Sequence, residues 1–182
     1  MTSKEVVWMA LPDSPAKRLM QRSGRDWKKA SSADLVSYIL DHFHALHREQ
    51  LPALIQQARR VEIAHPEHPD CPTGLAEHLH ALHQELESHM RKEEMTLFPL
   101  ITQDQLRCAD EAIHAIRVEH GEQVAAIRQI ESLTEGLVLP TDRCATWSAL
   151  YHGLHAFRED LLIHIHLENN VLFERFTVDY RH

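Results

Sequence analysis

The chain has 182 residues, enough for one domain with a sizeable core, and its 43% hydrophobic and 25% charged residues are normal for a globular protein. The formal net charge of −8 argues against nucleic acid or an anionic membrane as a partner, because both require a basic patch. No run of about 18 apolar residues exists, and Pro12 interrupts the short apolar stretch near the start, so we expect neither a transmembrane helix nor a signal peptide.

Four helices are predicted after an N-terminal arm. Residues 1–30 contain prolines and mixed charges without periodicity, so we expect a loosely ordered arm there and one all-α domain over residues 31–178. The helices are expected at about residues 33–64, 73–101, 105–133 and 141–176. Ser31 or Ser32, Thr73 and Thr141 are the expected N-caps, and Pro52 is expected to kink the first helix. Long helices joined by short loops predict an up-down-up-down four-helix bundle.

Each predicted helix carries a metal-capable side chain in the middle of its apolar stripe. In the second helix, leucines spaced by three and four residues lead to His89 and Glu93, and in the fourth helix the same count reaches His164 and Glu168. The first helix brings His44 and His47 to its stripe, and the third brings His120. Burying such groups costs free energy unless they are paired or bind an ion. The predicted metal ligands are His44, His89, Glu93, His120, His164 and Glu168.

The donor set suits two iron ions. His89 and Glu93 stand four residues apart, as do His164 and Glu168, so each pair shares a helix face, and in both helices Leu-Phe follows the Glu at the same distance. Each Glu can bridge two metals, and a bridging oxo or hydroxo group then leaves about one position open on each octahedral iron. Ferritin-like proteins instead use Glu-x-x-His pairs and four carboxylates, and with fewer negative ligands here we expect gas or redox chemistry rather than C–H oxidation. Zinc in the same ligands, and a non-metal core, are the alternatives.

Several other residues near the predicted centre are weaker candidates. His47 lies one turn from His44 and is either an alternative ligand or an outer partner of the ligands. Glu85 and Glu119 could each accept a hydrogen bond from an imidazole N–H, but each could equally be an ordinary exposed carboxylate on the helix surface. His65 follows His44 by 21 residues, about 30 Å along a helix, and is not expected to bind the same metals.

Four segments carry a resemblance to a known family: HFHALHREQLP, ESHMRKEEMTLFP, VEHGEQ and DLLIHIHLENNVLFERF. They resemble the hemerythrin-like HHE family and, more closely, the iron–sulfur cluster repair di-iron proteins, over about residues 26–176. The positions that match the family's metal ligands are the same six residues. The resemblance therefore implies that His44, rather than His47, is the ligand in the first helix. It also implies a bacterial protein of nitric oxide or peroxide stress, which binds or reduces nitric oxide and supports repair of damaged clusters.

One departure from that family concerns cysteine. Typical members begin with a small domain that carries a cysteine pair, whereas here only a short arm without Cys precedes the predicted bundle. The three cysteines, at 71, 108 and 144, are scattered and form no CxxC motif, which fits reduced thiols in the cytoplasm.

Three functions remain open at this stage. The first is a nitric-oxide-responsive di-iron protein that either binds nitric oxide or reduces it as an enzyme, and that could donate iron to iron–sulfur client proteins. The second is an O2-binding or redox-sensing module without turnover. The third is an iron reservoir or a scaffold for partners.

Overall fold

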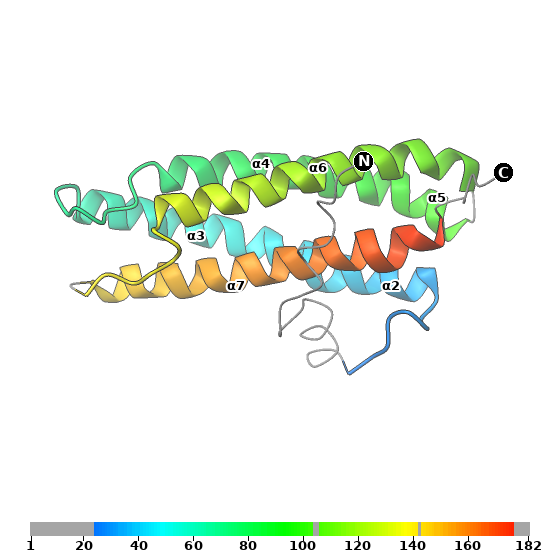
Figure 1. Ribbon diagram of the computed structural model, residues 1–182, viewed down its shortest axis with the longest axis horizontal. Helices are drawn as coiled ribbons and strands as arrows, with labels where there is room; N and C mark the ends of the chain where they lie inside the picture. The colour runs from blue at the N-terminus through cyan, green and yellow to red at the C-terminus, as the bar shows by residue number, and fades with distance from the viewer. Residues whose placement is uncertain (1–23, 104–105, 142, 177–182) are drawn as a thin grey trace, which may run out of the picture.

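The computed structural model describes residues 24–103, 106–141 and 143–176, apart from the side chains of residues 106–108. Its helices run side by side along the long axis of the molecule in alternating directions (Figure 1). In chain order, the first rod consists of α2 (Ser32–Tyr38), a π-helical turn (Ile39–His44) and α3 (Ala45–Ala64). The second consists of α4 (Leu75–Lys92), a π-helical turn (Glu93–Leu97) and α5 (Phe98–Thr102). The third is α6 (Leu106–Leu133), and the fourth consists of α7 (Ala145–Leu167), a π-helical turn (Glu168–Leu172) and a 3-10 turn (Phe173–Arg175).

These rods form the predicted four-helix bundle, so the expected fold class is confirmed. The segment α3 packs against both α4 and α7, and α4 packs against α6. Among the described residues, no helix combines the length and the apolar character needed to cross a membrane.

The helix starts agree only in part with the predicted caps. Ser31 caps the first rod, because its hydroxyl accepts a 3.0 Å hydrogen bond from the Asp34 amide. The predictions of Thr73 and Thr141 as caps are wrong, since the N-cap positions belong to Gly74 and Cys144. Thr73 is held in the preceding turn, where its amide and its hydroxyl both donate to the Cys71 carbonyl. Gly74 then enters α4 with φ 88°, a conformation that suits glycine.

The first rod continues through Pro52, which lies inside α3, and its irregular turn comes earlier, at Ile39–His44. Of the arm expected at residues 1–30, residues 1–23 lie outside the described part of the chain. Trp27 is buried against the bundle, where its ring stacks on Tyr38 at 4.3 Å and its carbonyl accepts a 2.7 Å hydrogen bond from Arg175.

The apolar core has two parts, with a polar layer between them. One cluster fills the end near the 65–74 loop and includes Leu54, Leu79 and Trp147. The other fills the opposite end and includes Leu35, Phe98 and Ile113. The buried charged and polar side chains of the middle layer therefore face apolar side chains along the bundle axis, which keeps water away from them.

Candidate metal centre

All six predicted ligands converge inside the middle of the bundle. Their potential ligand atoms form two groups of four, in each of which the atoms lie within 4.8 Å of one another. Glu93 and Glu168 belong to both groups, His44 and His164 complete one, and His89 and His120 complete the other. None of the six residues is more than 2% exposed. Every rod thus supplies one histidine, and the second and fourth rods each add a carboxylate.

Each carboxylate spans two histidines from different helices. The Glu93 oxygens lie 3.3 Å from His44 Nε2 and 3.3 Å from His89 Nε2. The Glu168 oxygens lie 2.9 Å from His120 Nε2 and 3.1 Å from His164 Nε2. One oxygen for each of two histidines is the arrangement that a bridging carboxylate needs.

Most of these facing atoms nevertheless lack a hydrogen bond of acceptable geometry. The unsatisfied buried atoms include Nε2 of three histidines and three carboxylate oxygens: His44, His89, His120, both oxygens of Glu93, and Oε2 of Glu168. Buried polar atoms in proteins are ordinarily satisfied, so a dense group of bare donor atoms indicates a place for cations. Imidazole nitrogen and carboxylate oxygen are compatible ligands of iron, and the residues present therefore fit a pair of iron ions.

The two carboxyl groups respond differently to burial. Burial raises the pKa of Glu93 to about 8, and the negative charge of Glu168 adds to this effect. Burial acts on Glu168 in the same direction, but the attraction of His164 and His120 outweighs it and holds the pKa of Glu168 well below its usual value. Two carboxylates this close resist being charged together, so the protein without cations keeps a proton on Glu93. Bound cations would take the place of that proton.

Outer partners hold the far ring nitrogen of three of the four histidines. His44 Nδ1 lies 2.8 Å from Glu94, His89 Nδ1 lies 2.8 Å from Glu119, and His120 Nδ1 lies 3.0 Å from the side-chain oxygen of Asn169. Such contacts fix the tautomer with the proton on Nδ1, which leaves Nε2 free to bind metal.

Two of these partners, Glu94 and Asn169, were missed by the sequence reasoning. The signal for them is the repeat itself, since a polar residue follows the Glu directly in both Glu93-Glu94 and Glu168-Asn169.

The internal repeat extends to the aromatic side chains. Phe98 follows Glu93 by five residues and its ring lies 5.8 Å from that of His44. Phe173 follows Glu168 by five residues and stacks on His120 at 6.1 Å. In both rods the π-helical turn begins at the carboxylate, and this turn brings the Phe to the inside of the bundle. Such turns are rare and concentrate at functional sites.

The weaker candidates divide clearly. Glu119 contacts His89, whereas Glu85 is exposed and lines a groove of about 330 Å³ between α4 and α6 that also borders Glu119 and His89. His47 is fully buried and stands outside both groups of four. His65 lies far from the centre, at the end of the bundle near the 65–74 loop, where its Nε2 is 3.3 Å from the Cys144 sulfur.

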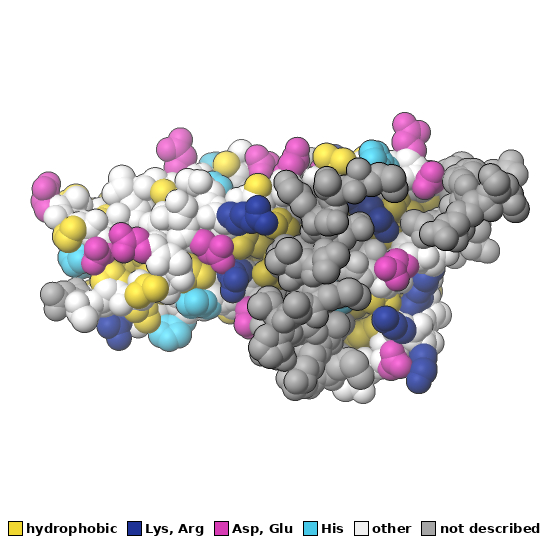
Figure 2. Space-filling model, viewed as in Figure 1, with side chains coloured by type: hydrophobic (Ala, Val, Ile, Leu, Met, Phe, Trp, Pro, Cys, Tyr) yellow, Lys and Arg dark blue, Asp and Glu magenta, His cyan; other side chains and the backbone are white. Residues whose placement is uncertain are grey.

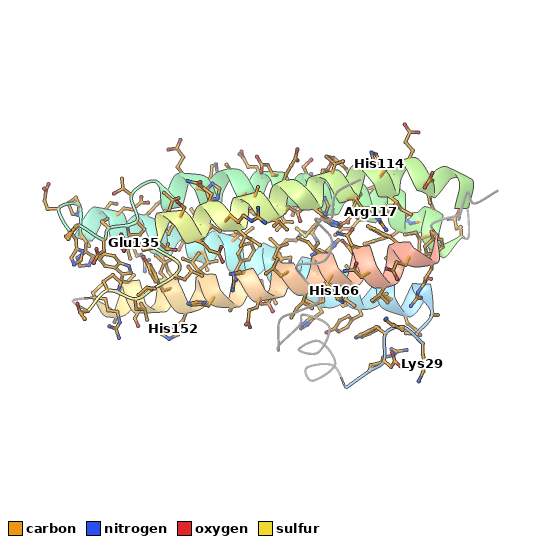
Figure 3. The ribbon with its side chains drawn as sticks, in the orientation of Figure 1. Lys29, His114, Arg117, Glu135, His152 and His166 are labelled. Atoms are coloured by element: carbon orange, nitrogen blue, oxygen red, sulfur yellow. The ribbon has the colours of Figure 1, made fainter. Side chains whose placement is uncertain are left out.

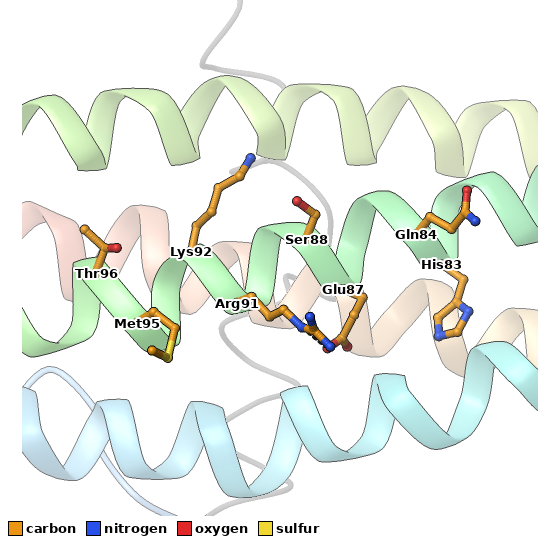
Figure 4. A pocket seen from close by; sticks show the side chains of 8 residues that line it. All are labelled: His83, Gln84, Glu87, Ser88, Arg91, Lys92, Met95 and Thr96. Atoms are coloured by element: carbon orange, nitrogen blue, oxygen red, sulfur yellow. Dashed lines mark hydrogen bonds and ion pairs between the residues drawn. The ribbon is translucent and has the colours of Figure 1, made fainter.

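Several surface features lie away from this centre. His114 and His152 are exposed, and Figure 3 places them on the outside of the helices. Acidic side chains are scattered over the face shown in Figure 2, in keeping with the net charge of −8. A groove of about 680 Å³ follows the outer surface of α4, where Glu87 pairs with Arg91, and none of the six predicted ligands lines it (Figure 4).

Comparison with known proteins gives a family and a set of named relatives. The family model described as "Hemerythrin HHE cation binding domain" matches residues 35–176. An "Iron-sulfur cluster repair protein YtfE" from Pectobacterium atrosepticum is 47% identical over 151 residues, which cover 83% of this chain and 68% of the relative. Its counterpart from Salmonella schwarzengrund is 44% identical and covered to 69%. A "Probable iron-sulfur cluster repair protein" from Haemophilus influenzae is 42% identical over 155 residues, which cover 85% of this chain and 70% of the relative.

Proposed function

Because the chain belongs to the hemerythrin HHE cation-binding family, we propose that its bundle holds a non-haem di-iron centre that binds or reduces nitric oxide and supports iron–sulfur cluster repair. The proposed ligands are His44, His89, Glu93, His120, His164 and Glu168. The names of the relatives support the link to cluster repair, and the donor set supports iron.

The observation that carries the proposal is the pair of overlapping four-residue groups that share two buried carboxylates. Four imidazoles and two carboxylates would offer fewer donor atoms than two octahedral ions take, even with an oxo or hydroxo group also bound. The remaining room would suit a small diatomic molecule. When bound, a ferrous pair would supply the two electrons that convert two NO molecules and two protons into N2O and water.

The protein's own residues prepare this centre in three ways. The outer contacts of Glu94, Glu119 and Asn169 hold three imidazoles with Nε2 facing inward. Phe98 and Phe173 pack against two of the imidazole rings, so apolar surface would border the bound ions. Lys92 and Arg48 neutralise the outer carboxylates, since Lys92 pairs with Glu119 and Arg48 pairs with Glu94.

The setting that we propose is the cytoplasm, where thiols stay reduced. Cys71 and Cys144 are both free thiols in the structure. Iron–sulfur proteins with damaged clusters are the proposed clients for donated iron.

Anaerobic titration of the reduced protein separates the candidate functions. We expect about two irons per chain, loss of added NO, and release of one N2O for every two NO consumed. NO binding without N2O release would reduce the proposal to NO capture. Reversible O2 binding together with indifference to NO would replace it with an oxygen-binding function, and recovery of zinc without iron from iron-replete cells would overturn the iron centre itself.

A further inference from the structure

His164 differs from the other three proposed ligand histidines in its outer ring nitrogen. Each of the other three places Nδ1 within 3.0 Å of a side-chain oxygen. His164 Nδ1 is buried and has no hydrogen-bond partner among the described residues, while its Nε2 faces Glu168. With Nε2 committed to the metal, Nδ1 carries the proton of the neutral ring and requires an acceptor.

The internal repeat explains why an oxygen is missing there. Glu119, which holds His89, comes directly before His120 in the third rod. The equivalent residue of the first rod, directly before His44, is Phe43. The Phe43 ring stacks on His164 at 5.4 Å with an interplanar angle of 5°, so it covers the face of the imidazole and offers no acceptor in the ring plane.

His47 offers an acceptor for this proton, because its ring neighbours that of His164. The Gln50 amide nitrogen donates to the Asp160 carboxylate at 2.7 Å, which directs the Gln50 oxygen to His47 Nδ1 at 3.2 Å. A carboxylate only accepts, so the Gln50 oxygen is the acceptor for His47, and His47 carries its proton on Nδ1. Its Nε2 is then a bare acceptor, buried and without a partner in the described structure.

The two rings are neighbours, and no hydrogen bond joins them in the described structure. Their centroids lie 5.3 Å apart and their planes are tilted by 31°. An N–H···N bond of about 3 Å between two imidazoles in line corresponds to a centroid separation of about 5 Å.

We propose that His47 is the positioning residue of His164: its Nε2 accepts the Nδ1 proton of His164, and Gln50 and Asp160 hold His47 in place. This inference rests on the proposed metal site. Each group of ligands then has one imidazole held by a carboxylate, Glu94 or Glu119, and one held by a neutral side chain, His47 or Asn169.

Zinc titration of the full-length protein tests the proposal without any NO chemistry. Loss of an outer partner ordinarily costs 10- to 100-fold in metal affinity. We therefore expect His47→Leu to lower the binding affinity for one of the two zinc ions by about 10- to 100-fold, and Glu119→Gln to lower the affinity for the other. His47→Gln keeps an acceptor oxygen and should restore most of the lost affinity. Gln123→Leu is the matched control, since Gln123 occupies the place of His47 in the repeat, is 4% exposed, and holds none of the four imidazoles in the described contacts.

A second measurement needs no variant. In the zinc-loaded wild-type protein, ¹⁵N NMR of the imidazoles should find the proton of His47 on Nδ1 and a coupling across the hydrogen bond from His164 Nδ1 to His47 Nε2. A proton on His47 Nε2, or unchanged binding of both zinc ions by His47→Leu, would overturn the inference. If the wild-type protein binds no metal at all, the proposed function fails instead, so the two failures are distinguishable.

Discussion

At the scale of single residues, the buried carboxyl groups of Glu93 and Glu168 present an energetic conflict. Both are fully buried, and each lies within 3.3 Å of two imidazole nitrogens. Removing an ionised carboxylate from water is costly unless opposite charge accompanies it. The metal-free protein resolves the conflict with a proton on Glu93, and the loaded protein would resolve it with cations.

The pKa of Glu93 makes the stability of the metal-free protein depend on pH. Its value of about 8 lies above the ordinary value of 4.5, so between these values the folded chain binds more protons than the unfolded chain. The contribution of Glu93 to stability is then lost as the pH rises from about 4.5 to 8. The neutral side chain of Glu93→Gln removes this loss. We expect metal-free Glu93→Gln to be more stable than metal-free wild type at pH 8, and the two to agree near pH 5, in urea unfolding.

Parallel stability curves for the two metal-free proteins from pH 5 to 9 would show that Glu93 does not titrate in this range. The same substitution should remove metal binding, because an amide replaces a bridging carboxylate. A change that stabilises the metal-free fold and abolishes its function is expected where buried charge serves the function.

A comparison of Glu168→Ala with His65→Ala tests which residues hold iron. Glu168 belongs to both ligand groups, so its loss should release both ions. His65 contacts Cys144 at the far end of the bundle, and its loss should leave about two irons per chain. Iron content per folded chain, with folding checked by circular dichroism, gives the answer. Equal loss of iron from both variants would contradict the assignment of the ligands.

At the scale of the elements, three π-helical turns lie at the metal layer, at Ile39–His44, Glu93–Leu97 and Glu168–Leu172. A π turn contains one residue more than an α turn, and this extra residue changes which side chains face inward beyond it. In the second rod Leu97, Phe98 and Ile101 are buried, while Leu100 is only partly buried. The turn thus places both the carboxylate and the Phe that covers the neighbouring imidazole.

Deletion of Met95 tests the role of one such turn. Met95 is 78% exposed and lies within Glu93–Leu97, so its side chain contributes little to the core. Without it the rod can continue as a regular α-helix, and the Glu93 carboxylate loses its alignment with His44. We expect metal affinity to fall by at least about tenfold, as for the loss of a supporting contact. The unfolding midpoint of the metal-free protein should stay the same or rise.

Met95→Ala is the matched control for this deletion, because it keeps the residue count and removes only an exposed side chain. It should bind metal as the wild type does. Normal metal affinity in the deletion variant would mean that the π turn does not align the ligands.

At the scale of the whole molecule, the metal layer lies between two apolar clusters, and the thiols of Cys71 and Cys144 lie outside that layer. Cys144 precedes His164 by twenty residues, about 30 Å along a helix, and Cys71 lies in the loop at the same end. Cys108 is twelve residues before His120, about 18 Å. The centre is therefore separate from the Cys71 and Cys144 thiols, and the backbone of Cys108 lies several turns along α6 from His120.

We expect the Cys71→Ser, Cys108→Ser, Cys144→Ser triple variant to keep about two irons and to react with NO at a near-normal rate. Stopped-flow mixing of the reduced protein with NO measures that rate. Loss of NO reactivity with full retention of iron would show that thiols take part in the chemistry.

The sequence by itself determined the four helices and the six inward side chains. Both follow from a spacing of three and four residues, which is a local property of the α-helix. The spacing held up to the metal layer, where Leu86, His89 and Glu93 are all buried. It fails where the helix departs from α geometry. The same count reaches Leu40 in the first rod and Leu100 in the second, which are only partly buried, whereas Ile39, Phe98 and Ile101 are buried.

Only the tertiary structure decided which outer side chains hold the imidazoles. Glu85 and Glu119 were equally good candidates from the sequence to accept an imidazole N–H, yet only Glu119 contacts His89. The contact depends on how far α6 is rotated and shifted against α4, and packing between rods sets that relation. Glu94 reaches His44, and Gln50 reaches Asp160 across 110 residues, for the same reason. Such pairings join separate helices, and the periodicity of one helix carries no information about the register of another.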